Sequence, residues 1–217
     1  MVPLEGFEPS DSWFRRPAPI PLAEVNIFMN PYCCHLDLPR PLVDGFDFRS
    51  INVYHSQTDV RNLNSDLVKI LDLLNLKVTF VPIFRTLPGQ ITPIHSDSSS
   101  PDLDFVKLNF VFNELDSAMV WYKPKSVKYT TKLTAIKTAY IQYEPNEVEE
   151  IHRQNLNGCS LAQVGIPHNV VVNTEIRYAV SLTLKSKETN KTISMQDAKE
   201  IFKDYLGTPD RIRTYNI

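Results

Sequence analysis

The apolar positions of two segments recur at the spacing of an amphipathic helix. In 64–77 they fall three or four residues apart, on one face of the predicted helix: Leu67, Ile70, Leu71 and Leu74. Asn64 or Ser65 can cap the start of that helix. The second segment, 194–207, opens with a Ser-x-x-Asp sequence typical of a capping box and ends at Gly207. We therefore expect one helix in each segment.

The chain between these helices has the composition of β-strands. It is rich in β-branched and aromatic residues and is interrupted by Pro, Gly, Asn and Ser. The pattern predicts eight short strands, at 78–87, 91–97, 105–113, 118–123, 138–144, 161–164, 168–173 and 176–185. These strands do not alternate with helices, as the strands of a parallel sheet would. We expect a mainly β fold, a double-sheet jelly roll or closed barrel with a few flanking helices.

The bulk composition fits one folded domain and excludes some function classes. The chain has 217 residues, of which 42% are hydrophobic, enough for one core. Lys and Arg number 23 against 25 Asp and Glu, so the net charge of −2 offers no clear patch for nucleic acid. No apolar run approaches the roughly 20 residues of a membrane span, and no signal pattern opens the chain. We expect a cytoplasmic protein without a membrane partner, of unknown oligomeric state.

Both ends of the chain look unlike the middle. The strings "EGFEPSDSWFRR" and "GTPDRIRTYNI" resemble peptides that arise when transfer-RNA genes are translated as coding sequence. A Pro-rich stretch at 17–21 also predicts an extended start. We expect a Pro-rich extension over 1–62, its first part a spurious or disordered translation. The folded domain would then cover 63–207, and a tail 208–217.

The three cysteines do not form a disulfide framework. Cys33 and Cys34 are adjacent and Cys159 is distant, which indicates a reducing compartment. Adjacent cysteines also lack the C-x2-C spacing of most structural zinc sites. We expect all three to be small buried apolar residues.

Two His-x-Asp pairs could chelate a metal ion. On a strand, side chains two residues apart share a face, so both members of His95-Ser-Asp97 could reach one ion. Chance alone supplies about 0.6 His-x-Asp/Glu pairs in this composition, so the motif needs further support. The other pair, His35-Leu-Asp37, lies in a Pro-rich stretch, where we expect a loop. His55 and His152 have no comparable neighbours in sequence and are expected at the surface.

A third histidine and an arginine follow on two predicted strands. His168 opens the first strand, and the second carries Arg177, Ala179 and Ser181 on one face. A guanidinium among apolar neighbours needs a carboxylate partner. That partner could be an internal Asp or Glu, or a small dicarboxylate ligand bound through two parallel hydrogen bonds.

Taken in order, His95-x-Asp97, His168 and Arg177 resemble the motif of the Fe(II)- and 2-oxoglutarate-dependent oxygenases. The resemblance covers roughly 76–185. It implies a double-stranded β-helix, a jelly-roll, cupin-like barrel, for the domain over 63–207. It also implies that His95, Asp97 and His168 bind Fe(II) through one face of its octahedron. Arg177 would then pair with the distal carboxylate of 2-oxoglutarate.

Four other residues would complete the cosubstrate site implied by this resemblance. Ser181 could assist Arg177, although it lies four residues on and departs from the frequent Arg-x-Ser spacing. Lys107 or Asn109 offers another way to hold the cosubstrate, because some members use a lysine on this strand. Tyr122 could form a wall of the pocket, although aromatic strand residues are more often part of a core.

The expected function is that of a dioxygenase with Fe(II) and 2-oxoglutarate as cofactors. It would oxidise an unidentified small-molecule or peptidyl substrate and release succinate and CO2. One alternative is a metal-dependent cupin of isomerase type that uses no 2-oxoglutarate, and another is a non-catalytic barrel that binds a ligand. Segment 123–138 contains five lysines and no acid. We interpret it as a solvated loop, with an anionic substrate or partner as the alternative.

Overall fold

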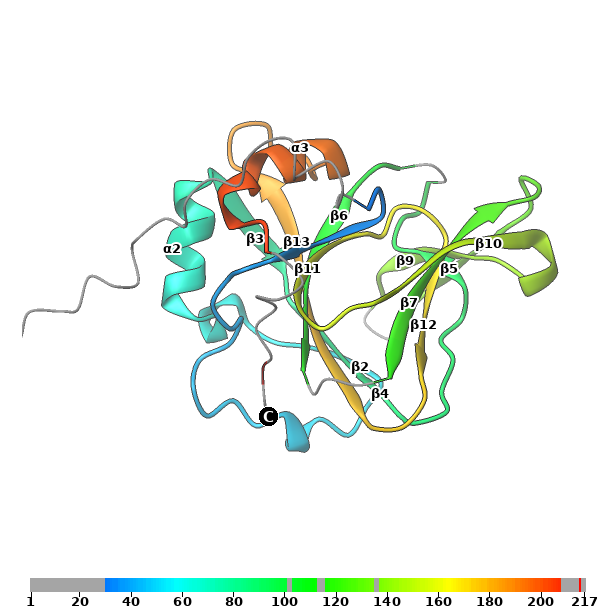
Figure 1. Cartoon of the computed structure of the whole chain (residues 1–217), viewed down its shortest axis with the longest axis horizontal. Helices are drawn as coiled ribbons and strands as arrows, with labels where there is room; N and C mark the ends of the chain where they lie inside the picture. The colour runs from blue at the N-terminus through cyan, green and yellow to red at the C-terminus, as the bar shows by residue number, and fades with distance from the viewer. Residues whose placement is uncertain (1–29, 101–102, 113–115, 135–136, 208–214, 216–217) are drawn as a thin grey trace, which may run out of the picture.

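The structure is a computed structural model that describes residues 30–100, 103–112, 116–134, 137–207 and Tyr215. The described part is mainly β, with two antiparallel sheets and two α-helices (Figure 1). The initial string, the Pro-rich stretch at 17–21 and most of the tail lie outside the described residues.

The first sheet has seven strands. Six of them follow in spatial order: β1 (Cys33–Leu36), β11 (Gly158–Gln163), β6 (Val106–Phe112), β13 (Arg177–Ser186), β4 (Pro82–Thr86) and β2 (His55–Gln57). The seventh, β3 (Leu76–Phe80), pairs with the far half of β13. All of its pairings are antiparallel.

The second sheet has six strands. In spatial order they are β10 (Val148–Asn155), β7 (Ser117–Pro124), β12 (His168–Val172), β5 (His95–Ser96), β9 (Ala139–Gln142) and β8 (Thr130–Leu133). The sequence pattern predicted the central strands and missed β1, β2, β8 and β10. All four lie at an end of a sheet's strand order, and β2 has only three residues, so their burial pattern is weak.

Both predicted helices form, and both are shorter than expected. In α2 (Ser65–Leu73), the Asn64 side chain accepts hydrogen bonds from two backbone N–H groups of the first turn. The helix ends there because Asn75 has a φ of 58°, after which β3 begins. In α3 (Met195–Ile201), Ser194 caps the first turn, and a 3-10 turn over Lys203–Tyr205 replaces the expected last turn.

Two predicted strands differ in extent. The expected strand 78–87 is divided at Val81 into β3 and β4, and β4 begins with Pro82, which has no N–H for a ladder hydrogen bond. The expected strand 91–97 shrinks to the two residues of β5. Thr92 is nevertheless tied to the neighbouring strand, because its Oγ1 accepts from Val170 N at 2.8 Å.

Two layers of apolar contact hold the fold together. The larger one lies between the first sheet and the helices α2 and α3, which cover one face of that sheet (Figure 1). The other lies between the two sheets and includes Val111 and Ala179 from the first sheet and Trp121 from the second. Because the sheets pack face to face through this layer, polar side chains near it are withdrawn from water.

The three cysteines are free and buried, as predicted. Cys34 and Cys159 lie in the larger core, and Cys33 lies between the sheets. Burial raises the pKa of Cys33 to about 12 and that of Cys34 to about 11. These thiols are therefore protonated at neutral pH, which suits packing better than metal binding.

Segments before residue 63 and after residue 207 contribute to the first sheet and its core. β1 and β2 belong to the first sheet, and Leu36 and Leu38 are buried in its core, so the folded unit reaches back at least to Cys33. At the other end, Tyr215 packs beside Phe110 and donates a hydrogen bond to Leu38 O at 2.7 Å. The apolar side chains of both segments are therefore part of the core.

None of the helices in the described part of the chain has the length and apolar content needed to cross a bilayer.

Candidate metal centre

Strand pairing in the second sheet brings His95 and His168 together. They are direct register partners on the neighbouring antiparallel strands β5 and β12. Their rings lie 4.5 Å apart between centroids. Asp97 follows β5 directly, and its backbone N–H is fixed by Val164 O at 2.9 Å, in the segment that leads into β12. Two segments distant in sequence thus place three potential ligands together.

The ligand atoms of His95, Asp97 and His168 form a compact group. One atom from each residue lies within 4.8 Å of the others, and no other such group of three or more His, Cys, Asp or Glu is found among the described residues. His95 Nε2 lies 3.3 Å from Asp97 Oδ1. Adjacent ligands of an octahedral ion lie about 3 Å apart, since each bond is about 2.1 Å long.

Backbone carbonyls orient both imidazole rings. His95 Nδ1 lies 2.8 Å from Pro93 O, and His168 Nδ1 lies 2.9 Å from Ile166 O. A carbonyl can only accept, so Nδ1 carries the proton in each neutral ring. Nε2 is thereby left with its lone pair, which is the form that binds a metal ion.

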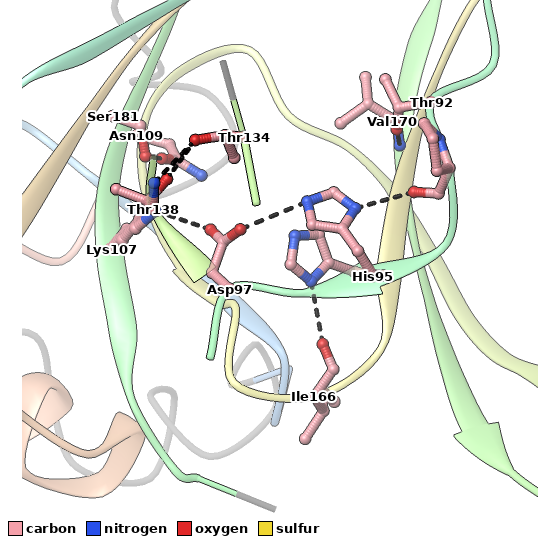
Figure 2. Close-up of polar contacts among 12 residues, drawn as sticks. Thr92, His95, Asp97, Lys107, Asn109, Thr134, Thr138, Ile166, Val170 and Ser181 are labelled. Atoms are coloured by element: carbon pink, nitrogen blue, oxygen red, sulfur yellow. Dashed lines mark hydrogen bonds and ion pairs between the residues drawn. The ribbon is translucent and has the colours of Figure 1, made fainter. Parts of the chain in front are cut away.

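Asp97 lies between a histidine and a lysine (Figure 2). Lys107 Nζ donates to Asp97 Oδ2 at 2.7 Å, while Oδ1 faces His95. Burial raises the pKa of Asp97, but Lys107 and the two histidines His95 and His168 lower it by more. The pKa of this carboxyl therefore lies well below its usual range. Asp97 is an anion at neutral pH, as a ligand must be.

His168 is the most enclosed of the three ligands. Only 4% of it is exposed, and it stands in register with the buried Trp121 on β7. Trp121 Nε1 donates to Gln163 O at 2.8 Å, which fixes the indole beside the histidine. Burial, reinforced by His95, lowers the pKa of His168 to about 3. The ring is therefore neutral and ready to bind a metal ion at physiological pH.

These residues fit a divalent first-row metal ion. Two neutral imidazoles and one carboxylate on one side of an ion form the two-histidine, one-carboxylate facial triad, which leaves positions open for other ligands. The sequence predicted this set of ligands, and the structure places all three within reach of one ion.

The metal-ligand group opens into a cavity of about 820 Å³. One wall comes from the first sheet and carries Phe80, Phe84 and Lys107. The opposite wall comes from the β8–β9 hairpin, including Leu133 and Tyr140. A cavity of this size accommodates a small organic molecule or one side chain of a larger one.

Of the residues expected to bind a cosubstrate, Lys107 lines the cavity and the others do not. Lys107 lines the cavity beside Asp97. Asn109 and Ser181 stand in register on β6 and β13, where Ser181 Oγ donates to Asn109 Oδ1 at 2.5 Å (Figure 2). Both are buried, and neither lines the cavity. Each satisfies part of the other's hydrogen bonding.

Arg177 and Tyr122 lie away from the cavity lining. Arg177 is buried at the start of β13, where burial lowers its pKa to about 10, partly offset by Tyr54. Tyr122 was expected to wall the pocket. Its neighbour Trp121 is the register partner of His168, so Tyr122 points to the opposite face of the sheet, where its hydroxyl contacts Asn169 Oδ1 at 3.2 Å.

His55 and His152 are not the surface residues that we expected. His55 lines the cavity and stacks on Phe84, with ring centroids 4.7 Å apart. His152 is half-buried on β10 and lies 5.7 Å from the ring of Trp121. Single polar residues on short or irregular strands give no burial signal in the sequence. Only the pairing of β2 with β4 reveals the position of His55.

The second His-x-Asp pair lies on a strand and not in the expected loop. His35 is on β1, and its register partner on β11 is Ser160. Burial lowers the pKa of His35, but no third histidine or carboxylate joins the pair in the described residues.

Comparisons with known proteins do not identify a family. No protein-family model matches the sequence, and no curated protein matches it. Among solved structures, the X-ray structure of E. coli ycfD is similar at 11% sequence identity and a TM-score of 0.36. The match covers 86% of this chain and 49% of that one, so this chain spans about half the length of ycfD. A likeness this distant assigns no activity, and the function has to be argued from the site.

Proposed function

We propose that the protein is an Fe(II)- and 2-oxoglutarate-dependent dioxygenase. It would oxidise an unidentified substrate while 2-oxoglutarate is converted to succinate and CO2. The observation that carries the proposal is the group formed by His95, Asp97 and His168 at the wall of a cavity. Both imidazoles have Nδ1 at a backbone carbonyl, which leaves Nε2 of each neutral ring unprotonated, as in the two-histidine, one-carboxylate sites of iron oxygenases.

The charges of the site support a dianionic cosubstrate. A divalent ion on two neutral histidines and Asp97 leaves one positive charge, and Lys107 adds a second. 2-Oxoglutarate carries two negative charges and would balance both. A lysine ammonium has three donors. Lys107 can therefore keep its hydrogen bond to Asp97 while donating to a carboxylate of the cosubstrate.

We assign Lys107 as the first anchor of the cosubstrate and Arg177 as the alternative. Lys107 borders the cavity, whereas Arg177 is buried outside its lining. Asn109 and Ser181 lie behind Lys107 on the same sheet, and we propose that they support the bound cosubstrate by shaping the floor of its site.

The strand arrangement is consistent with the double-stranded β-helix that such a function requires. Two antiparallel sheets pack face to face, His95 and His168 lie on neighbouring strands of the smaller sheet, and Asp97 directly follows the strand of His95. We propose this fold for the domain, with the first sheet buttressed by α2 and α3.

The residues around the site have separable tasks in the proposed reaction. Bound Fe(II) would supply the oxygen chemistry that links cosubstrate decarboxylation to substrate oxidation. Pro93 O and Ile166 O hold His95 and His168 in the metal-binding tautomer. Trp121 and the layer around it exclude water from the rear of His168. Lys107 orients Asp97 and binds the cosubstrate.

One observation favours a second candidate, a metal-dependent cupin of isomerase type. The single cationic side chain of the described cavity lining, Lys107, is already paired with Asp97. A site whose lysine served only that carboxylate would bind a metal ion without needing 2-oxoglutarate.

Anaerobic titration distinguishes the two candidates. Purified full-length protein is titrated with Fe(II) and then with 2-oxoglutarate, and the visible metal-to-ligand charge-transfer band is recorded. The oxygenase should develop the band, which reports chelation of the metal by the keto acid. The His168→Ala variant should not, because it lacks one of three ligands.

The cupin alternative has a different outcome in the same titration. Fe(II) would bind stoichiometrically, but 2-oxoglutarate would produce no band at millimolar concentration. Failure of Fe(II), Mn(II) and Co(II) to bind would exclude both candidates and leave a non-catalytic binding module.

A further inference from the structure

One side chain of the cavity has no task in the proposed reaction. His55 lies on β2 and lines the same cavity as His95, Asp97 and Lys107. Its Nε2 is buried and has no hydrogen-bond partner in the described part of the protein. A buried polar atom without a partner destabilises the fold, because it has lost its hydrogen bond to water and gained none in return. Such an atom at a cavity wall indicates a position where a ligand completes the hydrogen bond.

The ring of His55 is held in place before any ligand arrives. His55 and Phe84 are register partners on β2 and β4, and their rings are stacked at 24°. Burial, followed by Lys107, lowers the pKa of His55, so the imidazole is uncharged at neutral pH. A neutral imidazole can donate one hydrogen bond and accept one, and it suits a polar group that carries no charge.

The cavity offers no side chain for a second charged group. Among the described residues that line it, Asp97 supplies the only carboxylate and Lys107 the only ammonium group, and they are paired at 2.7 Å. In the proposed reaction Asp97 binds the metal and Lys107 binds the cosubstrate, so a charged substrate group would be desolvated without an opposite charge, which is strongly unfavourable. The substrate group that enters the cavity should therefore be neutral.

The remaining walls are largely apolar and aromatic. Five rings and several aliphatic side chains line them: Tyr54, Phe80, Phe84, Phe105, Tyr140, Val53, Leu103 and Leu133. Flat or aliphatic groups gain most from such walls.

We propose that the cavity accepts an uncharged, aromatic or largely apolar substrate group whose polar atom is bound by His55 Nε2. This names the substrate class of the proposed oxygenase and rests on that function for the identity of the reacting end, which is the metal-ligand group. His55 is thus a residue that determines specificity, on the opposite sheet from His95 and His168.

Fluorine NMR on the full-length chain, saturated with diamagnetic Zn(II) and with 2-oxoglutarate so that Asp97 and Lys107 are occupied, tests this proposal. The four probes share one ring and differ in charge and polarity: 4-fluorobenzamide, 4-fluorobenzoate, 4-fluorobenzylammonium and fluorobenzene. Affinities come from line broadening. We expect 4-fluorobenzamide to bind at least tenfold more tightly than either charged probe.

The His55→Phe variant isolates the ring nitrogen, because phenylalanine can keep the stacking on Phe84. It should weaken 4-fluorobenzamide about fivefold, as expected for one neutral hydrogen bond, and leave fluorobenzene unchanged. His152→Phe is the matched control, since that histidine also lies against an aromatic ring, Trp121, but outside the cavity. It should change neither affinity.

Three results would overturn the proposal: tighter binding of a charged probe, an unchanged 4-fluorobenzamide affinity in His55→Phe, or no binding of any probe. These results do not depend on the charge-transfer band. Loss of the band with intact probe selectivity would reject the oxygenase and keep the neutral-ligand cavity. The reverse combination would reject only the substrate class.

Discussion

The chain contains the same His-x-Asp sequence twice, in two different structural settings. His95 and Asp97 stand at a short strand whose neighbour carries a second histidine in register. His35 and Asp37 stand at β1, whose neighbour carries Ser160 in the corresponding position. Among the described residues, the first pair belongs to a group of three side chains that could hold a metal ion, and the second does not. The register of the neighbouring strand thus decides whether the motif becomes a site.

His95 and His35 also differ in the hydrogen bonding of their Nδ1 atoms. His95 Nδ1 is hydrogen-bonded to Pro93 O, whereas His35 Nδ1 is buried and has no hydrogen-bond partner among the described residues. The ring of His95 is therefore held in a tautomer that directs its other nitrogen to a metal ion. A His-x-Asp sequence does not by itself specify the tautomer of its histidine, because the carbonyl that orients the ring belongs to the local backbone.

The largest expected effect is the loss of the third ligand. In His168→Ala, affinity for Fe(II) or Mn(II) should fall at least 100-fold, because a facial triad is reduced to a bidentate site. The matched variant His35→Ala should leave metal affinity unchanged. Anaerobic calorimetry or competition with a chromophoric chelator measures both. Equal losses in the two variants would contradict the distinction between the pairs.

The next effect concerns the cation beside Asp97. Lys107→Met removes a charge-assisted hydrogen bond to the cosubstrate, and affinity for 2-oxoglutarate should fall about 10- to 100-fold. Arg177→Met should weaken it less, since Arg177 does not line the cavity. The charge-transfer band titrated with 2-oxoglutarate gives both affinities. A larger loss in Arg177→Met would transfer the anchoring role to the arginine.

The segment before His168 can be displaced by a substitution that changes none of the three potential metal ligands. A Cβ at Gly165 would collide with Leu103 O, so Gly165→Ala must displace the segment whose Ile166 O orients the histidine. We expect the free energy of unfolding to fall by about 1 to 3 kcal/mol, as for overpacking in a core. Chemical denaturation measures it.

The matched change for Gly165→Ala is Gly207→Ala, where the nearest atom is Leu36 C at an ordinary 3.5 Å. It should cost less than Gly165→Ala. A larger cost at Gly207 would show that the segment before His168 tolerates displacement.

The smallest effect is the pH dependence of the metal-free protein. The folded pKa of His168 is about 3, below the unfolded value of about 6.5. Stability from this histidine is therefore complete above pH 6.5 and is lost as pH falls toward 3. The loss is at most about 1.4 kcal/mol per pH unit for one proton.

Denaturation between pH 7 and pH 4.5 tests this slope. His168→Gln has no proton to gain and should show a shallower pH dependence than the wild type. An unchanged slope would mean that the histidine takes up its proton inside the fold.

Local patterns in the sequence were sufficient for much of the fold. Helical spacing with an Asn64 cap predicted α2, and runs of β-branched and aromatic residues bounded by turn residues predicted β6, β12 and β13. The same composition was of no use for β1 and β2, because each is short and pairs with a single neighbour. Strands of this kind are defined by their partner and not by their own pattern.

The metal ligands could be predicted, but the rest of the site could not. His95, Asp97 and His168 share a residue pattern that a known family uses. The ion pair of Lys107 with Asp97 depends on which face of β6 meets β5, a property of the tertiary fold. His55 enters the cavity from a segment that the sequence placed outside the domain. Tyr122 was expected at the pocket wall because the sequence does not show which side chains of β7 share a face with His168 on β12.

The pairing of Lys107 with Asp97 has a consequence for how the protein is made. Three metal ligands gathered in a buried place would ordinarily leave an uncompensated carboxylate until an ion arrived. Here the chain supplies its own cation, held 2.7 Å from Asp97 Oδ2. Synthesis of the protein and acquisition of its metal can therefore be separate events. If the site binds a metal as proposed, a cell short of that metal could accumulate the finished polypeptide as a reserve and activate it when the metal returns.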